Sequence, residues 1–134
     1  MGTRGAVSGK PEIPSSDSTL SLLAVHASTK MAEPRIEALR RMAEARPEDP
    51  RLQFGLAVEL LNAGQVREGA EALRAYLAVA EDEGNGWARL GGALEELGDV
   101  NGAREAYARG LEIAAGRGHE GLAEEMREAL ENLA

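Results

Sequence analysis

Apolar side chains recur every three or four positions along most of the chain after residue 50. The regular segments cover about 51–63, 66–80, 86–97 and 100–115. This spacing is typical of helices that bury one face and expose the other. Because only a few residues separate the segments, we expect consecutive helices to lie antiparallel, as hairpins.

The residues between the segments carry signals for helix ends. Gly64 and Gly98 follow the first and third segments, where glycine takes the left-handed backbone conformation of a C-terminal cap. Asp49 precedes Pro50 at the start of the first segment, and Asp99 precedes the fourth segment. Aspartate is a favoured N-cap, and proline is a favoured first helical residue. These boundaries agree with the periodicity and predict two helical hairpins.

The two hairpins repeat each other at an offset of 34 residues. Eight positions are identical at this offset, with Leu56, Leu60, Gly64, Val66, Glu71, Ala72, Leu77 and Ala80 matched by Leu90, Leu94, Gly98, Val100, Glu105, Ala106, Leu111 and Ala114. A fixed period of this length indicates a repeat architecture, in which each hairpin stacks on the next.

The second hairpin resembles the tetratricopeptide repeat, whose pattern is W-x2-L-G-x2-(bulky)-x3-G followed by a small, a large and another small position. The matching residues are Trp87, Leu90, Gly91, Leu94, Gly98, Ala103, Tyr107 and Gly110. The resemblance covers about residues 32–115. It implies an all-α fold, a right-handed superhelix of stacked antiparallel helix hairpins with about six helices.

The resemblance also implies a division of the domain, taken as residues 31–134. The parts are a half repeat at 32–47, full repeats at 50–83 and 84–115, and a C-terminal capping helix at 118–133. Gln53 and Tyr76 depart from the family pattern, because a tryptophan and a small residue are usual at their positions. Beyond residue 115 the period fails, and Leu122 and Met126 begin one apolar stripe on an otherwise polar helix. Such a helix suits the exposed end of a solenoid.

Two adjacent glycines, Gly91 and Gly92, lie inside the third segment, where each costs about 1 kcal/mol relative to alanine. The resemblance implies that Gly91 lies where the helices of a hairpin cross, opposite Ala103, with Trp87 and Tyr107 around it. A buried tryptophan removes about 150–250 Å² from water, which gives roughly 4–6 kcal/mol of gross stabilisation. That gain exceeds the cost of Gly91. Gly92 is expected to leave room in a binding groove.

In the family, the first helices of successive hairpins line a concave groove. The residues that the resemblance places there are Arg51, Phe54, Val58, Leu61, Asn62, Asn85, Ala88, Arg89, Gly92, Glu95 and Glu96. Phe54, Val58 and Leu61 would form an apolar floor flanked by arginines. Such a floor suits an apolar anchor from an extended peptide or an amphipathic helix, with arginine to engage a carboxylate. The alternative is that the preceding helix or the N-terminal residues 1–30 cover this floor.

We therefore expect a non-enzymatic scaffold for protein–protein interaction, with a protein or peptide partner of unknown identity. Family members that grip a C-terminal carboxylate use Lys and Asn where this chain has Phe54 and Val58, so no clamp of that kind is predicted. The alternative function is self-association as a homodimer, either through the open edge of a hairpin or through the face of the N-terminal helix that carries Ile36, Leu39 and Met42. A deep pocket with perturbed ionisable groups would instead indicate an enzyme.

Charge and composition narrow the partner classes. The net charge of −8 argues against nucleic acid or an anionic membrane as a partner. The chain has no cysteine and no apolar run long enough to cross a bilayer, so we expect a soluble, cytoplasmic protein. Residues 1–30, rich in Ser, Gly and Pro, are predicted to be a disordered leader or an added or upstream segment. Alternatively, Leu20, Leu22 and Leu23 form a degenerate helix that packs on the domain.

No residue pattern predicts catalysis, a cofactor or a metal. Residues 116–121 match G-x-G-x-x-G, but a helix precedes them, where a dinucleotide site needs a strand. The two histidines, His26 and His119, have no patterned partner for metal or nucleophile chemistry. The acidic run 81–83 lacks the ligand spacing of a calcium loop, and we interpret it as a solvated turn between repeats.

Overall fold

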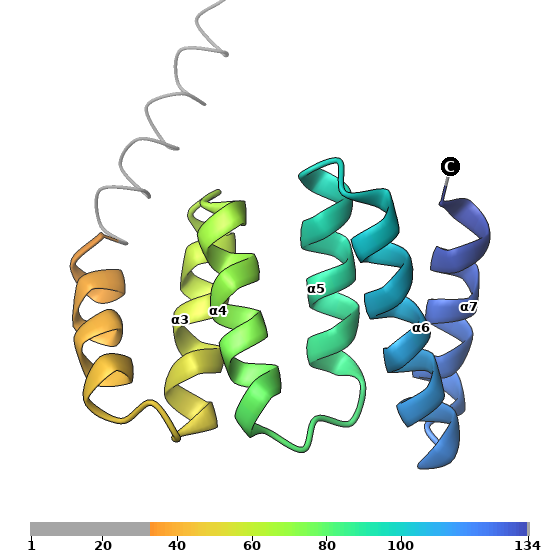
Figure 1. The fold of residues 1–134 in the computed structure, drawn as a ribbon, viewed down its shortest axis with the longest axis horizontal. Coiled ribbons are helices and arrows are strands. Elements are labelled where there is room, and N and C mark those ends of the chain that lie inside the picture. The colour runs from red at the N-terminus through yellow and green to blue at the C-terminus, as the bar shows by residue number, and fades with distance from the viewer. Residues whose placement is uncertain (1–32, 134) are drawn as a thin grey trace, which may run out of the picture. The chain divides into compact units, whose positions relative to one another are not determined.

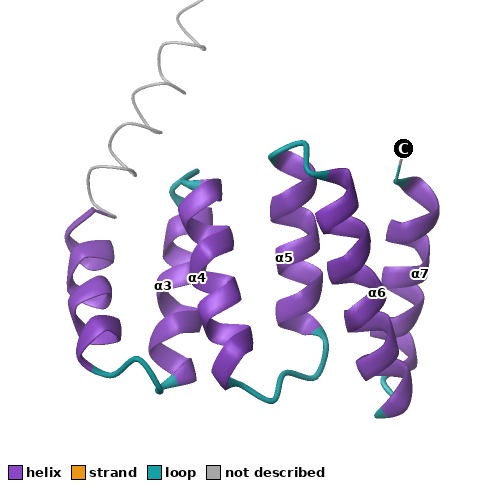
Figure 2. Cartoon of the chain, in the orientation of Figure 1, coloured by secondary structure: helices purple, strands orange, loops and turns teal. Residues whose placement is uncertain are grey.

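The computed structural model describes residues 33–133, which contain six helices and no strand. A helix over residues 33–45 precedes α3 (Pro50–Asn62), α4 (Val66–Val79), α5 (Asn85–Glu96), α6 (Val100–Gly116) and α7 (Glu120–Asn132). Figure 1 shows the helices in chain order, and Figure 2 shows that short turns join them. The predictions for residues 1–30 lie outside the described residues. The all-α prediction is confirmed.

Each helix from α3 to α7 packs against its neighbours in the chain. The pairs in contact are α3 with α4, α4 with α5, α5 with α6, and α6 with α7. The range predicted as the first full repeat, 50–83, contains α3 and α4, and the second, 84–115, contains α5 and all of α6 except its last residue. Nearest-neighbour packing of this kind is what a stack of hairpins requires.

The predicted helix ends are confirmed. The Asp49 carboxylate accepts a hydrogen bond from the backbone N–H of Arg51 at 3.0 Å, and Pro50 opens α3. The Asp99 carboxylate accepts one from the backbone N–H of Gly102 at 2.9 Å. Gly64 and Gly98 have φ angles of 83° and 82°, the left-handed conformation that glycine adopts without steric cost.

Small side chains lie at the helix contacts, and a few large ones fill the space between them. Ala57 and Ala103 are fully buried, so neighbouring helices approach closely at these positions. Leu60, Leu73 and Met126 are the largest fully buried side chains among the described residues. Met126 joins α7 to the array, because its sulfur lies 2.5 Å from where a Cβ on Gly110 would stand. The helix α7 therefore packs on α6, as expected of a closing helix.

The two adjacent glycines have different environments. A Cβ on Gly91 would lie 2.6–2.8 Å from three atoms of the Tyr107 ring, closer than carbon atoms approach in proteins. A Cβ on Gly92 would meet only the Tyr107 hydroxyl, at an ordinary 3.8 Å. The prediction that close packing requires a small residue at Gly91 is confirmed, and the Tyr107 ring lies against it.

The prediction of a buried Trp87 is wrong in degree. Tyr107 is 7% exposed, but Trp87 is only partly buried. Its Cβ packs near Gly110, while two surface hollows between the second helices, α4 and α6, adjoin the residue. The stabilisation expected from full burial of this tryptophan is therefore too large, and close packing at Gly91 depends mainly on Tyr107.

Candidate functional site

We use the name groove for the eleven residues that the sequence analysis placed on the concave face. All of them are at least partly accessible to solvent. The exposed members are Arg51, Asn62, Asn85, Arg89, Glu95 and Glu96, and the partly buried ones are Phe54, Val58, Leu61, Ala88 and Gly92. Contacts of these side chains show which of them share a surface.

Phe54 of α3 and Arg89 of α5, two of the predicted groove residues, contact each other. The guanidinium carbon of Arg89 lies 5.5 Å from the centre of the Phe54 ring, a cation–π distance. The Phe54 ring also contacts Tyr76 of α4, with ring centres 5.0 Å apart and planes inclined by 56°. Groove residues from both repeats therefore meet around one aromatic ring.

Tyr76 is held in place by Asp82 from the loop between α4 and α5. The Tyr76 hydroxyl donates a hydrogen bond to the Asp82 carboxylate at 2.7 Å. The same carboxylate accepts bonds from the backbone N–H groups of Gly84 at 2.8 Å and Gly86 at 2.9 Å. Asp82 is only 9% exposed. The prediction of a solvated turn is therefore wrong for Asp82, because its carboxylate satisfies amides at the start of α5 that have no helical partner.

The departure of Tyr76 from the family pattern is compensated in the next helix. A Cβ on Gly86 would lie 2.7 Å from the edge of the Tyr76 ring, so Gly86 leaves the space that this large residue occupies. Burial, together with the hydrogen bond to Asp82 and its charge, raises the pKa of Tyr76 to about 12. The hydroxyl therefore stays protonated as a donor at neutral pH. Sequence reasoning missed Tyr76 as a site residue, and its large size at a usually small position was the available signal.

An open hollow lies between the start of α3 and the end of α4, and we call it the Phe54 hollow. Its volume is about 500 Å³, and it is lined by Pro50, Arg51, Phe54, Gly55, Tyr76, Val79, Ala80 and Glu81. Val79 is 45% exposed. Only two of the predicted groove residues line it, so the apolar surface extends from the groove onto α4.

Two predicted groove residues take part in packing within their own hairpins. Leu61 lies against Gly69 of α4, where a Cβ would be 2.6 Å from its Cδ2. Glu95 accepts a hydrogen bond from the Tyr107 hydroxyl. Burial and this bond raise the pKa of Tyr107 well above its usual value. Leu61 and Glu95 therefore make contacts within their own hairpins while remaining at least partly accessible.

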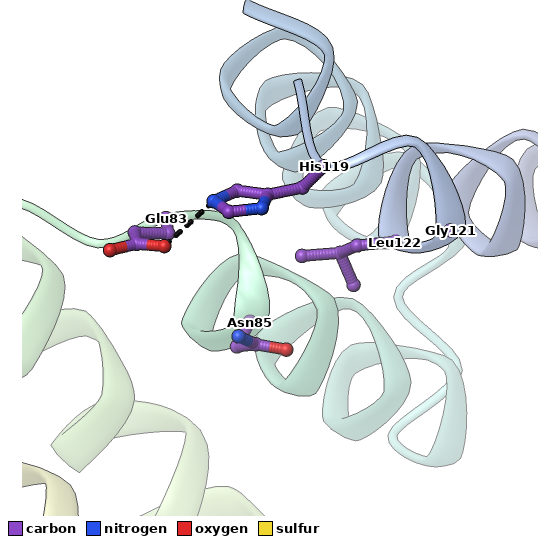
Figure 3. A pocket seen from close by; sticks show the side chains of 5 residues that line it. All are labelled: Glu83, Asn85, His119, Gly121 and Leu122. Atoms are coloured by element: carbon purple, nitrogen blue, oxygen red, sulfur yellow. Dashed lines mark ion pairs between the residues drawn. The ribbon is translucent and has the colours of Figure 1, made fainter. Parts of the chain in front are cut away.

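Asn85 lies at a second hollow, between the start of α5 and the start of α7 (Figure 3). Its volume is about 290 Å³, and it is also lined by Glu83, His119, Gly121 and Leu122. His119 Nε2 lies 2.7 Å from Glu83 Oε1, a contact that the sequence analysis did not predict. Sequence separation hid this pair, because the loop before α5 and the loop before α7 meet only after the hairpins stack.

Between residues 33 and 133, no group of three or more His, Cys, Asp or Glu side chains could hold a metal ion. None of the described helices has the length and apolar character that a membrane crossing requires.

Comparisons with known proteins agree with the arrangement of hairpins. A sequence model described as tetratricopeptide repeat matches residues 29–114. A TPR repeat-containing protein from Pseudomonas aeruginosa is 35% identical over 98 residues, which cover 73% of this chain and 93% of that protein. The crystal structure of the Sgt2 TPR domain from Aspergillus fumigatus matches with a TM-score of 0.55 and 26% identity, over 89% of this chain and 83% of that one. The predicted right-handed superhelix is confirmed.

Proposed function

Because the chain belongs to the tetratricopeptide repeat family, whose members are generally non-catalytic modules for protein–protein interaction, we propose that it binds a partner protein in the groove. The partner contributes a peptide or a helix that lies across the first helices, α3 and α5. The groove residues predicted from the sequence are its proposed contacts, with Leu61 and Glu95 acting mainly through packing. Fold alone does not assign a partner, so the proposal depends on the groove itself.

The contact of Arg89 with Phe54 is the observation that supports this proposal best. It joins accessible side chains of two successive repeats into one surface. Ala88 and Gly92 are small, partly buried residues on α5, and they lie on one face of the helix because they are four positions apart. Small residues beside an aromatic one leave room for side chains of a partner.

A Gly92→Gln variant tests the proposal without loosening the fold. Glutamine is a better helix former than glycine by roughly 0.5–1 kcal/mol, and the position has space for a Cβ. The added side chain would fill the groove. We expect proteins captured from an extract of the native cells by the parent chain to be lost with this variant.

Ala108→Gln is the matched control, because Ala108 is exposed on the second helix α6. It should capture the same proteins as the parent. Equal capture by Gly92→Gln and the parent, with both folded by circular dichroism, would contradict groove binding.

The alternative function is self-association through the first helix. The helix face proposed for it has less exposed apolar surface than the sequence suggested. Ile36 is 5% exposed, and Leu39 lies near Gly55 of α3, 3.8 Å from where a Cβ would stand. Only Met42 of this set remains 49% exposed. The cytoplasmic location and the absence of nucleic-acid partners, membrane partners and cofactors remain predictions.

A further inference from the structure

The Phe54 hollow, which shares Arg51 and Phe54 with the groove, is an open concavity with a largely apolar lining. The Phe54 and Tyr76 rings and the Val79 side chain line it. The Tyr76 hydroxyl already donates to Asp82, so that ring offers the hollow its apolar part. Val79 is one of only two large apolar side chains that are highly exposed between residues 33 and 133. Apolar surface exposed in a concavity is typical of binding sites.

Arg51 lines the hollow, and Arg89 lies over the ring of Phe54, another lining residue. Arg51 is 90% exposed and only loosely paired with Asp49, with 3.5 Å between Nε and Oδ1. Arg89 lies over the Phe54 ring and forms no ion pair with another described residue. A guanidinium stacked on an aromatic ring keeps its N–H edge free to bind a carboxylate.

The hollow also has one acidic lining residue. Glu81 follows the end of α4, whereas Arg89 belongs to α5 and lies over the Phe54 ring, one wall of the hollow. An acidic partner group is therefore favoured next to the arginines and disfavoured next to Glu81.

We propose that the partner places an apolar side chain in the Phe54 hollow and an adjacent carboxylate against Arg89 and Arg51. The occupant is an apolar, acidic segment of another protein, and its recognition rests on the groove function proposed above. Charge complementarity with two exposed arginines supports this chemistry over a basic segment. The apolar anchor supplies contact area, and the arginines select acidic sequences.

The test uses three synthetic pentapeptides with blocked ends, so that no terminal charge contributes. Their sequences are Gly-Asp-Phe-Asp-Gly, Gly-Lys-Phe-Lys-Gly and Gly-Asp-Ala-Asp-Gly. Each is titrated into the full-length ¹⁵N-labelled chain, and amide chemical shifts report the affinity and the place of binding. We expect the first peptide to bind most tightly and to shift amides in residues 50–55 and 76–81. Equal binding of the lysine peptide would overturn the proposal.

Two pairs of variants separate the anchor from the charge. Val79→Asp puts a charge into the hollow and should abolish binding, while Ala78→Asp changes the exposed neighbour at the same helix end and should not. Arg89→Gln should weaken binding of the acidic peptide about three- to tenfold. Arg109→Gln, the same change on α6, should leave the affinity unchanged. An affinity insensitive to Arg89→Gln would also overturn the proposal.

Further outcomes identify which proposal fails. If no peptide binds but capture of native partners still depends on Gly92, the groove function stands and this anchor chemistry is wrong. If the acidic peptide binds at the hollow but capture ignores Gly92→Gln, the groove function fails and the anchor site stands. A third outcome is that no peptide binds, while sedimentation shows self-association that Val79→Asp abolishes. That result would identify a second copy of the chain as the occupant and refute an acidic partner.

Discussion

The adjacent glycines of α5 allow the close helix contact to be tested by two nearly identical substitutions. Gly91→Ala and Gly92→Ala each replace glycine by alanine inside the same helix, so each gains about 1 kcal/mol of helix propensity. They differ in the space that the new methyl group enters. At Gly91 it would lie 2.6–2.8 Å from the Tyr107 ring, and at Gly92 its nearest neighbour would be 3.8 Å away.

The Tyr107 ring cannot easily move away from a methyl group on Gly91. The Tyr107 side chain, from α6, is 7% exposed. Its hydroxyl donates a hydrogen bond to Glu95 of α5, the helix that carries Gly91. Overpacking of a filled site costs about 1–3 kcal/mol. Because the propensity gain is common to both variants, it cancels in their difference. We expect Gly91→Ala to be less stable than Gly92→Ala by about 1–3 kcal/mol, with Gly92→Ala more stable than the parent.

Urea denaturation followed by far-ultraviolet circular dichroism measures this difference, since the midpoint shifts while the slope stays constant if only stability changes. The parent chain and the two variants are compared at the same protein concentration and pH. Equal midpoints for Gly91→Ala and Gly92→Ala would show that the ring yields freely. The close approach of Tyr107 would then not explain why Gly91 lacks a side chain.

Three further predictions concern turns and hydrogen bonds. Gly64→Ala should lose about 1 kcal/mol, because its φ of 83° is unfavourable for alanine, whereas Gly116→Ala, with equal free space and no positive φ, should show no such loss in thermal melts. Asp82→Ala should cost about 1–3 kcal/mol by leaving buried donors unpaired; unchanged amide exchange at the start of α5 would contradict this. Because the folded-state pKa values of Tyr76 (about 12) and Tyr107 lie above the ordinary value, both contribute stability that is present below pH of about 10 and lost as pH rises beyond it. Absorbance at 295 nm should show little phenolate in the folded chain at pH of about 10 and much more in urea, and equal absorbance in the two states would refute the raised values.

The sequence was sufficient to predict the helices, their caps and the stacking of hairpins. Each of these depends on residues close together in the chain. The three- and four-residue spacing marks one buried face per helix, and Gly64 and Asp99 mark helix ends by their own backbone and side-chain chemistry. The 34-residue period adds that the hairpins are equivalent units, and the resemblance to the tetratricopeptide repeat implied the close contact at Gly91.

The same period could not predict which side chains meet across the repeats. Periodicity shows that a face is buried, but not which atoms cover it. The joining of Phe54 to Arg89, the burial of Asp82 under Tyr76, and the pairing of His119 with Glu83 all connect residues from different helices or loops.

Only the tertiary structure decided these contacts, because each one depends on the particular neighbour that stacking supplies. Equivalent positions in two repeats have different neighbours, and a large residue such as Tyr76 fits only because Gly86 in the next helix leaves space. Trp87 is likewise only partly buried, because its neighbours leave a surface hollow beside it. Local chemistry thus determined the units of this protein, and the contacts between units determined which side chains share a surface.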